Sequence, residues 1–390
     1  MAEPFRNLLN PALVGAAAHH LKRVHRPFDA AGFVRAAADG LDDLPMKARA
    51  LQIADALQAH LPDDFDAACG VIEKALAPAP APDDERLDTL VTGEKGLAGW
   101  VVWPLGEVVA RGGTAAPERA LQALHALTQR HTAEWALRPV LQAHTDLTLA
   151  TLQRWTTDPS VHVRRLVSEG SRPRLPWGEV LRFLIEDPSP TAPLLEALQD
   201  DRSAYVRRSV ANHLNDVARD HPVRLVAWLQ RHLPGANDDR RALLRHASRG
   251  RIKAGDAAVL AAWGTHQPFE GEVAWSVSPG RVLLGGTLTW KAVLHSRASS
   301  PQKLEVDVVM HHVKASGATS PKVFKGWRVT LDPGQRVALS RAHPLRQITT
   351  RRYHPGRHAV TLQINGHAVA EAAFDLSLPP VPAGPAKAGQ

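Results

Sequence analysis

Hydrophobic positions in the first two thirds of the chain recur with the period of an α-helix. Up to Gly264, long segments rich in Ala and Leu repeat their apolar residues at helical spacing, and short Pro, Asp or Gly interruptions separate them. The segment APAPAPDDER at 77–86 is polar and proline-rich, so it predicts a surface loop between helical units. The pattern as a whole predicts a helical domain over 1–264.

After Gly264 the apolar residues alternate with polar ones, as in a strand with one buried face. The clearest example is a run whose alternate side chains would share one face of a sheet: Leu288, Trp290, Ala292 and Leu294. Asn365-Gly366 lies between two such runs and predicts a tight hairpin, because both turn positions need a positive φ. We therefore expect an immunoglobulin-like β-sandwich over 265–378 and a disordered tail at 379–390.

The helical part contains an internal repeat. DPSVHVRRLVSEG begins at Asp158 and aligns with DRSAYVRRSVANH, which begins at Asp201, 43 residues later. A weaker third copy, LLRHASRGRIKAGD, follows at a shorter interval. A period of about 40 to 47 residues is typical of HEAT or armadillo units, whose paired helices stack into a solenoid that offers a surface to an elongated ligand.

Each repeat helix has an apolar stripe and a polar stripe. In the second copy the predicted buried stripe is Val206, Val210, Leu214 and Val217. Arg208, Asn212 and Asp216 fall opposite, and Arg165 and Glu169 occupy that stripe in the first copy. An Arg followed four residues later by an acid is also an ordinary exposed pair worth a few tenths of a kcal/mol, so the stripe alone does not indicate a site.

Composition narrows the possible functions. Lys and Arg number 47 against 39 Asp and Glu, a net charge of +8 that favours a polyanionic partner, although a biased genome would also give an arginine-rich chain. No apolar run has the roughly 20 residues needed to span a bilayer, and the amino terminus lacks a secretory signal, so we expect a cytoplasmic protein. Cys69 is the only cysteine, which excludes an intramolecular disulfide and a zinc site rich in cysteine.

The common cofactor motifs are also missing. The chain has no phosphate-binding glycine loop, no dinucleotide fingerprint and no His pair at metal-ligand spacing, so we expect neither a cofactor nor a metal. Aromatic residues make up only 5% of the chain, yet several Trp residues lie near the repeat helices: Trp135, Trp155, Trp177 and Trp228. Trp is more often core than site, but Trp177 follows the proline-broken SRPRLP segment at the expected start of a helix. Acids within an arginine-lined groove would repel phosphates, which suggests chemistry on a cation.

Several long motifs resemble one known family. RRLVSEGSRPRLPW at 164–177 and YVRRSVANHLNDVARDHP at 205–222 are similar to the AlkC-type alkylpurine DNA glycosylases, which are relatives of the AlkD proteins. EPFRNLLNP, HTAEWALRP and YHPGRHAVTLQINGH extend the resemblance over nearly the whole chain. The resemblance implies a HEAT-like solenoid carrying an immunoglobulin-like domain, with both holding damaged duplex DNA.

The resemblance also implies a set of catalytic residues. The cleft acids of the family correspond to Glu134, Glu169 and Asp216, and its cleft Trp corresponds to Trp177, whereas its Phe after the first acid is Trp135 here. Family members are thought to cut the glycosidic bond without flipping the base. A base alkylated at N3, such as 3-methyladenine or 3-methylcytosine, is already cationic, so a carboxylate need only stabilise the sugar. We expect Asp216 to do this, in a monofunctional enzyme.

The basic residues of these segments are candidates for phosphate contacts. In the helical part they are Arg164, Arg165, Arg172, Arg174, Arg207, Arg208 and Arg245. In the β domain they are Lys322, Lys325, Arg328, Arg351 and Arg352, although a merely solubilising surface has the same composition. We expect a monomer that binds alkylated double-stranded DNA without an obligate protein partner. The rival interpretation is a non-catalytic scaffold that binds nucleic acid or protein.

Overall fold

The computed structural model describes residues 5–348 and 351–379, which form two compact units. The first unit comprises the chain up to Arg224 together with His232–Ala247, and the second comprises Leu225–Arg231 together with the chain from Ser248 onward. The tail predicted at 379–390 lies, from residue 380 on, outside the described residues.

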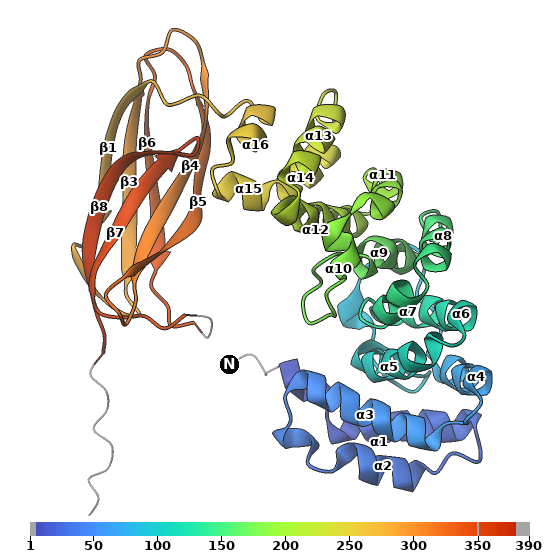
Figure 1. Ribbon diagram of the computed structural model, residues 1–390. Helices are drawn as coiled ribbons and strands as arrows, with labels where there is room; N and C mark the ends of the chain where they lie inside the picture. Colours follow the sequence, from blue (N-terminus) through green and yellow to red (C-terminus); the bar gives the residue numbers. More distant parts are fainter. Residues whose placement is uncertain (1–4, 349–350, 380–390) are drawn as a thin grey trace, which may run out of the picture. The chain divides into compact units, whose positions relative to one another are not determined.

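The first unit is built from α-helices (Figure 1). Over the described residues, no helix is both long enough and apolar enough to cross a membrane. In chain order the helices up to Ala247 are α1 (Pro11–Val24), α2 (Ala30–Ala38), α3 (Met46–His60), α4 (Phe65–Ala75), α5 (Val102–Gly113), α6 (Pro117–Thr128), α7 (Leu137–Ala143), α8 (Thr145–Trp155), α9 (Val161–Gly170), α10 (Arg182–Glu186), α11 (Ala192–Leu198), α12 (Ala204–Asp220), α13 (Pro222–His232) and α14 (Asp238–Ala247). Most of α13, Leu225–Arg231, belongs to the second unit.

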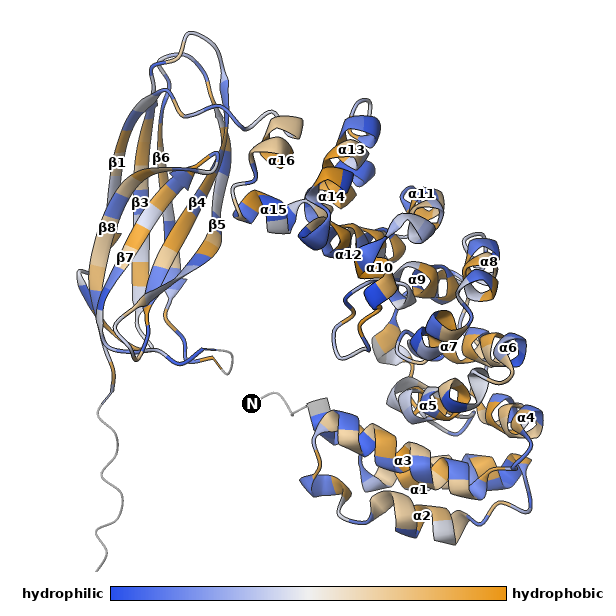
Figure 2. Cartoon of the chain, viewed as in Figure 1, coloured by the Kyte–Doolittle hydropathy of each residue, from blue (hydrophilic) through white to orange (hydrophobic). Residues whose placement is uncertain are grey.

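These helices stack in two rows. In one row α3 contacts α5, α5 contacts α7, α9 contacts α12, and α12 contacts α14. In the other row α4 contacts α6, α6 contacts α8, and α8 contacts α11. Helices of the two rows pair with one another, as α5 does with α6, and apolar residues recur along the helices of both rows (Figure 2). This is the HEAT-like solenoid that the repeat predicted.

The two aligned repeat copies adopt the same local structure. Asp158 Oδ1 accepts a hydrogen bond of 2.8 Å from the Ser160 amide at the start of α9, and Asp201 Oδ1 accepts one of 2.8 Å from the Ser203 amide at the start of α12. A short polar residue that binds the backbone two residues ahead favours this turn. The predicted buried stripe of α12 is confirmed by the low exposure of Val206, Val210, Leu214 and Val217.

The segment 77–86 is a surface loop, as predicted. It contains no helix or strand, and its residues are exposed or half-buried. The Val161 amide at the start of α9 donates to the Pro82 carbonyl at 2.8 Å, and Arg130 Nε donates to the Ala77 carbonyl at 2.8 Å. The loop is therefore fixed to the repeats that it crosses.

The second unit is a β-sandwich that also includes two short helices, α15 (Arg249–Lys253) and α16 (Ala257–Ala262). One sheet has the order β1-β3-β6 and the other the order β2-β8-β7-β4-β5. The strands are β1 (Gly271–Ser278), β2 (Arg281–Leu283), β3 (Thr287–Ser296), β4 (Gln302–Val313), β5 (Thr319–Leu331), β6 (Arg336–Pro344), β7 (Gly356–Ile364) and β8 (His367–Ser377).

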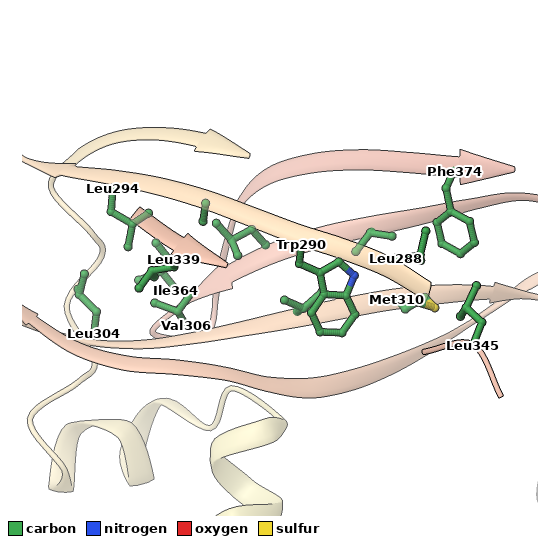
Figure 3. Close-up of a cluster of buried hydrophobic side chains, with 14 of the residues drawn as sticks. Leu288, Trp290, Leu294, Leu304, Val306, Met310, Leu339, Leu345, Ile364 and Phe374 are labelled. Carbon is green, nitrogen blue, oxygen red and sulfur yellow. The ribbon is translucent and has the colours of Figure 1, made fainter. Parts of the chain in front are cut away.

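Side chains from both sheets form one core (Figure 3). Leu288, Trp290 and Leu294 from β3 face the buried residues Val306 and Met310 from β4, which confirms the sandwich and the alternation predicted for β3. The predicted hairpin is also confirmed, because β7 and β8 pair directly. Its turn residues Asn365 and Gly366 have φ values of 50° and 84°.

Candidate active site

A line of buried acids and arginines connects α9 with α12. Arg172, just after α9, donates from Nη1 to Glu169 Oε1 at 2.6 Å and from Nε to Asp216 Oδ2 at 2.8 Å. Glu169 lies in the last turn of α9 and Asp216 in the last turns of α12, so one guanidinium joins the two helices through their carboxylates. The structure thus brings together two of the three acids that the sequence singled out.

The third acid joins the same line through a second arginine. Glu134 lies just before α7, and its Oε2 accepts hydrogen bonds from Thr132 Oγ1 at 2.6 Å and from Arg165 Nη1 at 2.9 Å. Arg165 Nη2 also lies 3.7 Å from Glu169 Oε1. The resulting order is Glu134, Arg165, Glu169, Arg172 and Asp216, in which each arginine is shared between two acids. We refer to these five residues as the acid cluster.

The arginines keep Glu169 ionised although it is buried. Only 5% of Glu169 is exposed. Burial alone raises the pKa of its carboxyl, but Arg165 and Arg172, together with the Ser209 hydroxyl, outweigh that effect and hold the pKa below its usual range. Burial likewise lowers the pKa of the Arg172 guanidinium, and its bonds to Asp216 and Glu169 raise it overall. Glu169 and Arg172 are therefore both charged at neutral pH.

Hydroxyl and aromatic side chains complete the surroundings of the cluster. Ser168 Oγ donates to Ser209 Oγ at 2.6 Å, and Ser209 Oγ donates to Glu169 Oε2 at 2.6 Å. Arg165 lies over the Tyr205 ring, with Cζ 4.9 Å from the ring centroid. Burial raises the pKa of the Tyr205 phenol to about 12, so this ring stays neutral. Both oxygens of Glu169 are thus engaged by donors.

Trp177 has an unusual backbone and an exposed ring. It lies in the loop between α9 and α10 with a φ of 62°, and 58% of it is exposed. We expected it at the start of a helix, and this was wrong: α10 begins only at Arg182, and a left-handed residue cannot start a right-handed helix. Its ring stacks with those of Trp103, with centroids 6.4 Å apart, and Trp135, with centroids 6.5 Å apart.

Two of the candidate phosphate-binding arginines are used inside the repeats. Arg164 forms a two-pronged pair with Asp201 and donates to the carbonyls of Asp158 and Pro159. Arg207, 43 residues later, pairs with Asp239 and donates to the carbonyl of Asp201 in the same way. These contacts join one repeat to the next, so the donors of both arginines already have protein acceptors.

The other candidate arginines of the helical unit differ in exposure. Arg165 and Arg172 belong to the acid cluster, whereas Arg208 is exposed on α12. Arg174 makes a two-pronged pair with Asp220 at 2.9 and 3.1 Å and is half-buried. Arg245 is half-buried on α14. Of the seven, Arg208 is the one that the structure leaves most accessible for a phosphate.

The basic residues of the β unit do not share one face. The register places Lys325 opposite Asp307 and Arg328 opposite Glu305, with Arg328 Nε 2.9 Å from Glu305 Oε1. Lys322 lies opposite Met310, whose side chain points into the core. Lys322 therefore lies on the core-facing side of β5, whereas Lys325 and Arg328 lie on the opposite side. Arg351 contacts His312 Nε2, and Arg352 is exposed beside it.

Sequence reasoning missed two contributors to this site. Ser209 binds Glu169, and Trp103 on α5 stacks 4.4 Å from Trp135 and in parallel with Trp177. The only available signal for Trp103 was the spacing of WVVW, which places two indoles on one helical face, and a serine within a helix gives no signal. Among the described residues, no group of three His, Cys, Asp or Glu side chains could hold a metal ion. Cys69 is buried, and burial raises the pKa of its thiol to about 11.

Known proteins resemble this chain over almost its whole length. Residues 272–378 match the family described as the C-terminal Ig-like domain of the uncharacterised protein YhaZ. YhaZ from Bacillus subtilis is 31% identical over 367 residues, which cover 93% of this chain and 96% of YhaZ. The alkylpurine DNA glycosylase AlkC from Pseudomonas fluorescens, solved bound to DNA containing an abasic site analogue, is 33% identical with a TM-score of 0.86, and the match covers 96% of this chain and 100% of that one. This chain therefore belongs to the family that contains YhaZ and AlkC.

Proposed function

We propose that this protein is a monofunctional DNA glycosylase that removes cationic N-alkylated bases, of the 3-methyladenine and 3-methylcytosine type, from duplex DNA. The observation that carries the proposal is the acid cluster: three carboxylates held by two arginines, in a chain similar throughout to a DNA glycosylase. The product would be an abasic site that enters base excision repair. The protein would act as a monomer.

The cluster suits a reaction in which positive charge develops on the sugar. As the glycosidic bond of an N3-alkylated base breaks, the deoxyribose becomes oxocarbenium-like, and a nearby carboxylate lowers the barrier. Both oxygens of Glu169 accept short bonds from Arg172 and Ser209, so we assign it a fixed negative potential. We assign Asp216 to the sugar, with the further option of orienting the attacking water.

The leaving base needs no help from a proton donor. It carries its positive charge before the bond breaks, so the reaction requires neither a general acid nor a cofactor. The base therefore need not be flipped into a pocket where a side chain could protonate it. The exposed face of Trp177 would attract the cationic base or sugar. The motifs around the acids contain no lysine that could form a Schiff base, which favours simple hydrolysis over strand cleavage.

The test is release of free base from methylated duplex DNA under single-turnover conditions. We expect the full-length protein to release 3-methyladenine but not uracil, and Asp216→Asn to be about 100-fold to 1,000-fold slower with unchanged DNA affinity. Asp187→Asn is the matched control, because it alters an exposed pair with Arg224 outside the cluster. Tight DNA binding without base release would favour the scaffold. Efficient uracil release would contradict the mechanism.

We also propose that the β unit, residues 265–378, contributes phosphate contacts. Lys322 and Arg352 are exposed. If both meet phosphates, replacing each with glutamine in the full-length protein should reduce the slope of log affinity against log salt by about 0.9. Glu371→Gln, which removes an exposed carboxylate on β8, changes the net charge by one in the opposite direction, so a slope that responds to net charge alone should shift the opposite way in this control. An unchanged slope in both variants would show that this unit does not hold the DNA backbone through these two residues.

A further inference from the structure

The loop that carries Trp177, residues 171–181, is fixed by two side chains to which the proposed reaction gives no role. We call this segment the Trp177 loop. It connects α9 to α10 and carries both Arg172, which joins Glu169 to Asp216, and Trp177. A small shift of this loop would therefore move the acid cluster and the exposed indole together.

Arg138 on α7 is the first of these side chains. It is fully buried, and its guanidinium donates to four backbone carbonyls: Gly170 at 2.9 Å, Arg172 at 2.8 Å, Pro173 at 3.4 Å and Glu179 at 2.5 Å. Burial lowers the pKa of Arg138 to about 10, so the group remains protonated at neutral pH. An arginine buried for stability alone is usually paired with a carboxylate, whereas the planar guanidinium of Arg138 donates its hydrogen bonds to both ends of one loop.

Trp135 is the second. Its indole Nε1 donates to the Pro176 carbonyl at 3.2 Å, one residue before the left-handed Trp177. A bulky residue with a positive φ is disfavoured and persists only when its surroundings hold it. The peptide group that precedes Trp177 is the one that Trp135 fixes. The phenylalanine expected at this position from the family resemblance has no N–H to donate.

We propose that Trp135 and Arg138 are positioning residues that hold the Trp177 loop in its strained conformation, so that Trp177 and the two acids joined by Arg172 keep fixed positions toward the substrate. This inference rests on the proposed glycosylase function for its kinetic consequence, but not for its structural one. Trp135 acts through the Pro176 carbonyl on Trp177, and Arg138 acts through the loop ends on Arg172. Neither needs to touch the DNA.

Trp135→Phe is the decisive variant, because it keeps an aromatic ring in the stack with Trp103 while it removes the N–H together with part of the indole surface. Two measurements are made on the full-length protein: hydrogen–deuterium exchange of peptides covering 171–181, and single-turnover release of 3-methyladenine together with DNA affinity. We expect faster exchange in the Trp177 loop and base release about fivefold slower, the equivalent of one hydrogen bond, with unchanged affinity. Trp155→Phe, a half-buried indole at the end of α8, is the control and should change neither.

A double-mutant cycle separates positioning from a general structural effect. If Trp135 acts through Trp177, then Trp135→Phe should slow base release in the wild-type background but not further in a Trp177→Ala background. Arg138→Lys, which loses the fork but keeps the charge, should accelerate exchange at both ends of the loop. Unchanged exchange and release in Trp135→Phe, or the same fivefold loss without Trp177, would overturn the proposal. If the wild-type protein releases no base, the glycosylase function fails and the exchange experiment alone decides the positioning role.

Discussion

Replacing Glu169 with glutamine tests whether this buried group is an anion that stabilises the helical unit. The side chain accepts Arg172 Nη1 and Ser209 Oγ, both at 2.6 Å, and lies 3.7 Å from Arg165 Nη2. A glutamine keeps one acceptor oxygen for Arg172, and Ser209 can rotate to accept from the new amide. What is lost is the charge shared by two guanidiniums.

The size of the effect follows from these contacts. A hydrogen bond to a charged group contributes about 1.5–3 kcal/mol, and breaking a buried ion pair costs about 3–5 kcal/mol. Arg165 keeps Glu134 and Arg172 keeps Asp216, so neither guanidinium is left without an anion. We therefore expect Glu169→Gln to lower the free energy of unfolding by about 2–4 kcal/mol at pH 7.

The pH dependence gives the sharper test. The pKa of Glu169 is lower in the folded state than in the unfolded chain, so its contribution is complete above the ordinary glutamate pKa of about 4.3. It is lost progressively as the pH falls from that value through the folded pKa. The difference between wild type and Glu169→Gln should thus be constant from pH 7 to about pH 5 and shrink below that.

The measurement is urea unfolding followed by helical circular dichroism, at pH steps from 7 to 3. Most helices lie in the first unit, so this signal reports on the unit that contains Glu169. Glu186→Gln, an exposed carboxylate on α10, is the control and should leave stability within about 0.5 kcal/mol of wild type. A glutamine variant as stable as wild type at pH 7, or a difference that persists unchanged to pH 3, would refute the assignment of Glu169 as a stabilised anion.

Further variants separate binding, chemistry and folding. Glu134→Gln should slow base release by only about tenfold, because Glu134 and Asp216 lie at opposite ends of the acid cluster. An effect as large as that of Asp216→Asn would reverse the assigned roles. Arg164→Ala should lower the free energy of unfolding by about 3–5 kcal/mol in urea titrations, because it leaves Asp201 buried without this partner. Arg208→Ala should leave stability unchanged and reduce the salt slope of DNA binding by about 0.9. Asn365→Ala should lower the melting temperature of the β unit for two reasons: Asn365 Oδ1 accepts a hydrogen bond of 2.8 Å from the Glu305 amide, and Asn365 has a positive φ that alanine tolerates less well. An unchanged melting temperature would contradict this.

Features that depend on local sequence were predictable. The repeat of 43 residues predicted the equivalence of α9 and α12, and the Asp two residues before the Ser forms the same turn in both copies. Asn365-Gly366 predicted its hairpin for a similar reason, since few other pairs accept two positive φ values. The alternation of β3 gave the buried face without knowledge of the opposite sheet.

Features that depend on partners distant in the sequence were not predictable. Arg164 and Arg165 are adjacent and chemically identical, yet one joins two repeats through Asp201 and the other lies between two acids. The polar stripe suggested an accessible Glu169, but only 5% of it is exposed, because arginines and hydroxyls from neighbouring elements pack over it. Periodicity distinguishes polar from apolar faces and cannot show that a polar face is also covered.

The balance of charge in the acid cluster explains how acids could lie at the DNA-binding surface that we propose. Three carboxylates and two guanidiniums leave one net negative charge, whereas three unpaired acids would repel phosphate strongly and would themselves resist ionisation. A unit cation about 4 Å from that charge gains about 4 kcal/mol at an effective dielectric constant of about 20, and the attraction appears in full only as the sugar becomes positive. In the proposed function Arg165 and Arg172 therefore do two things at once: they hold the pKa of the buried Glu169 carboxyl below its usual range, and they would reduce the repulsion of DNA to that of a single charge.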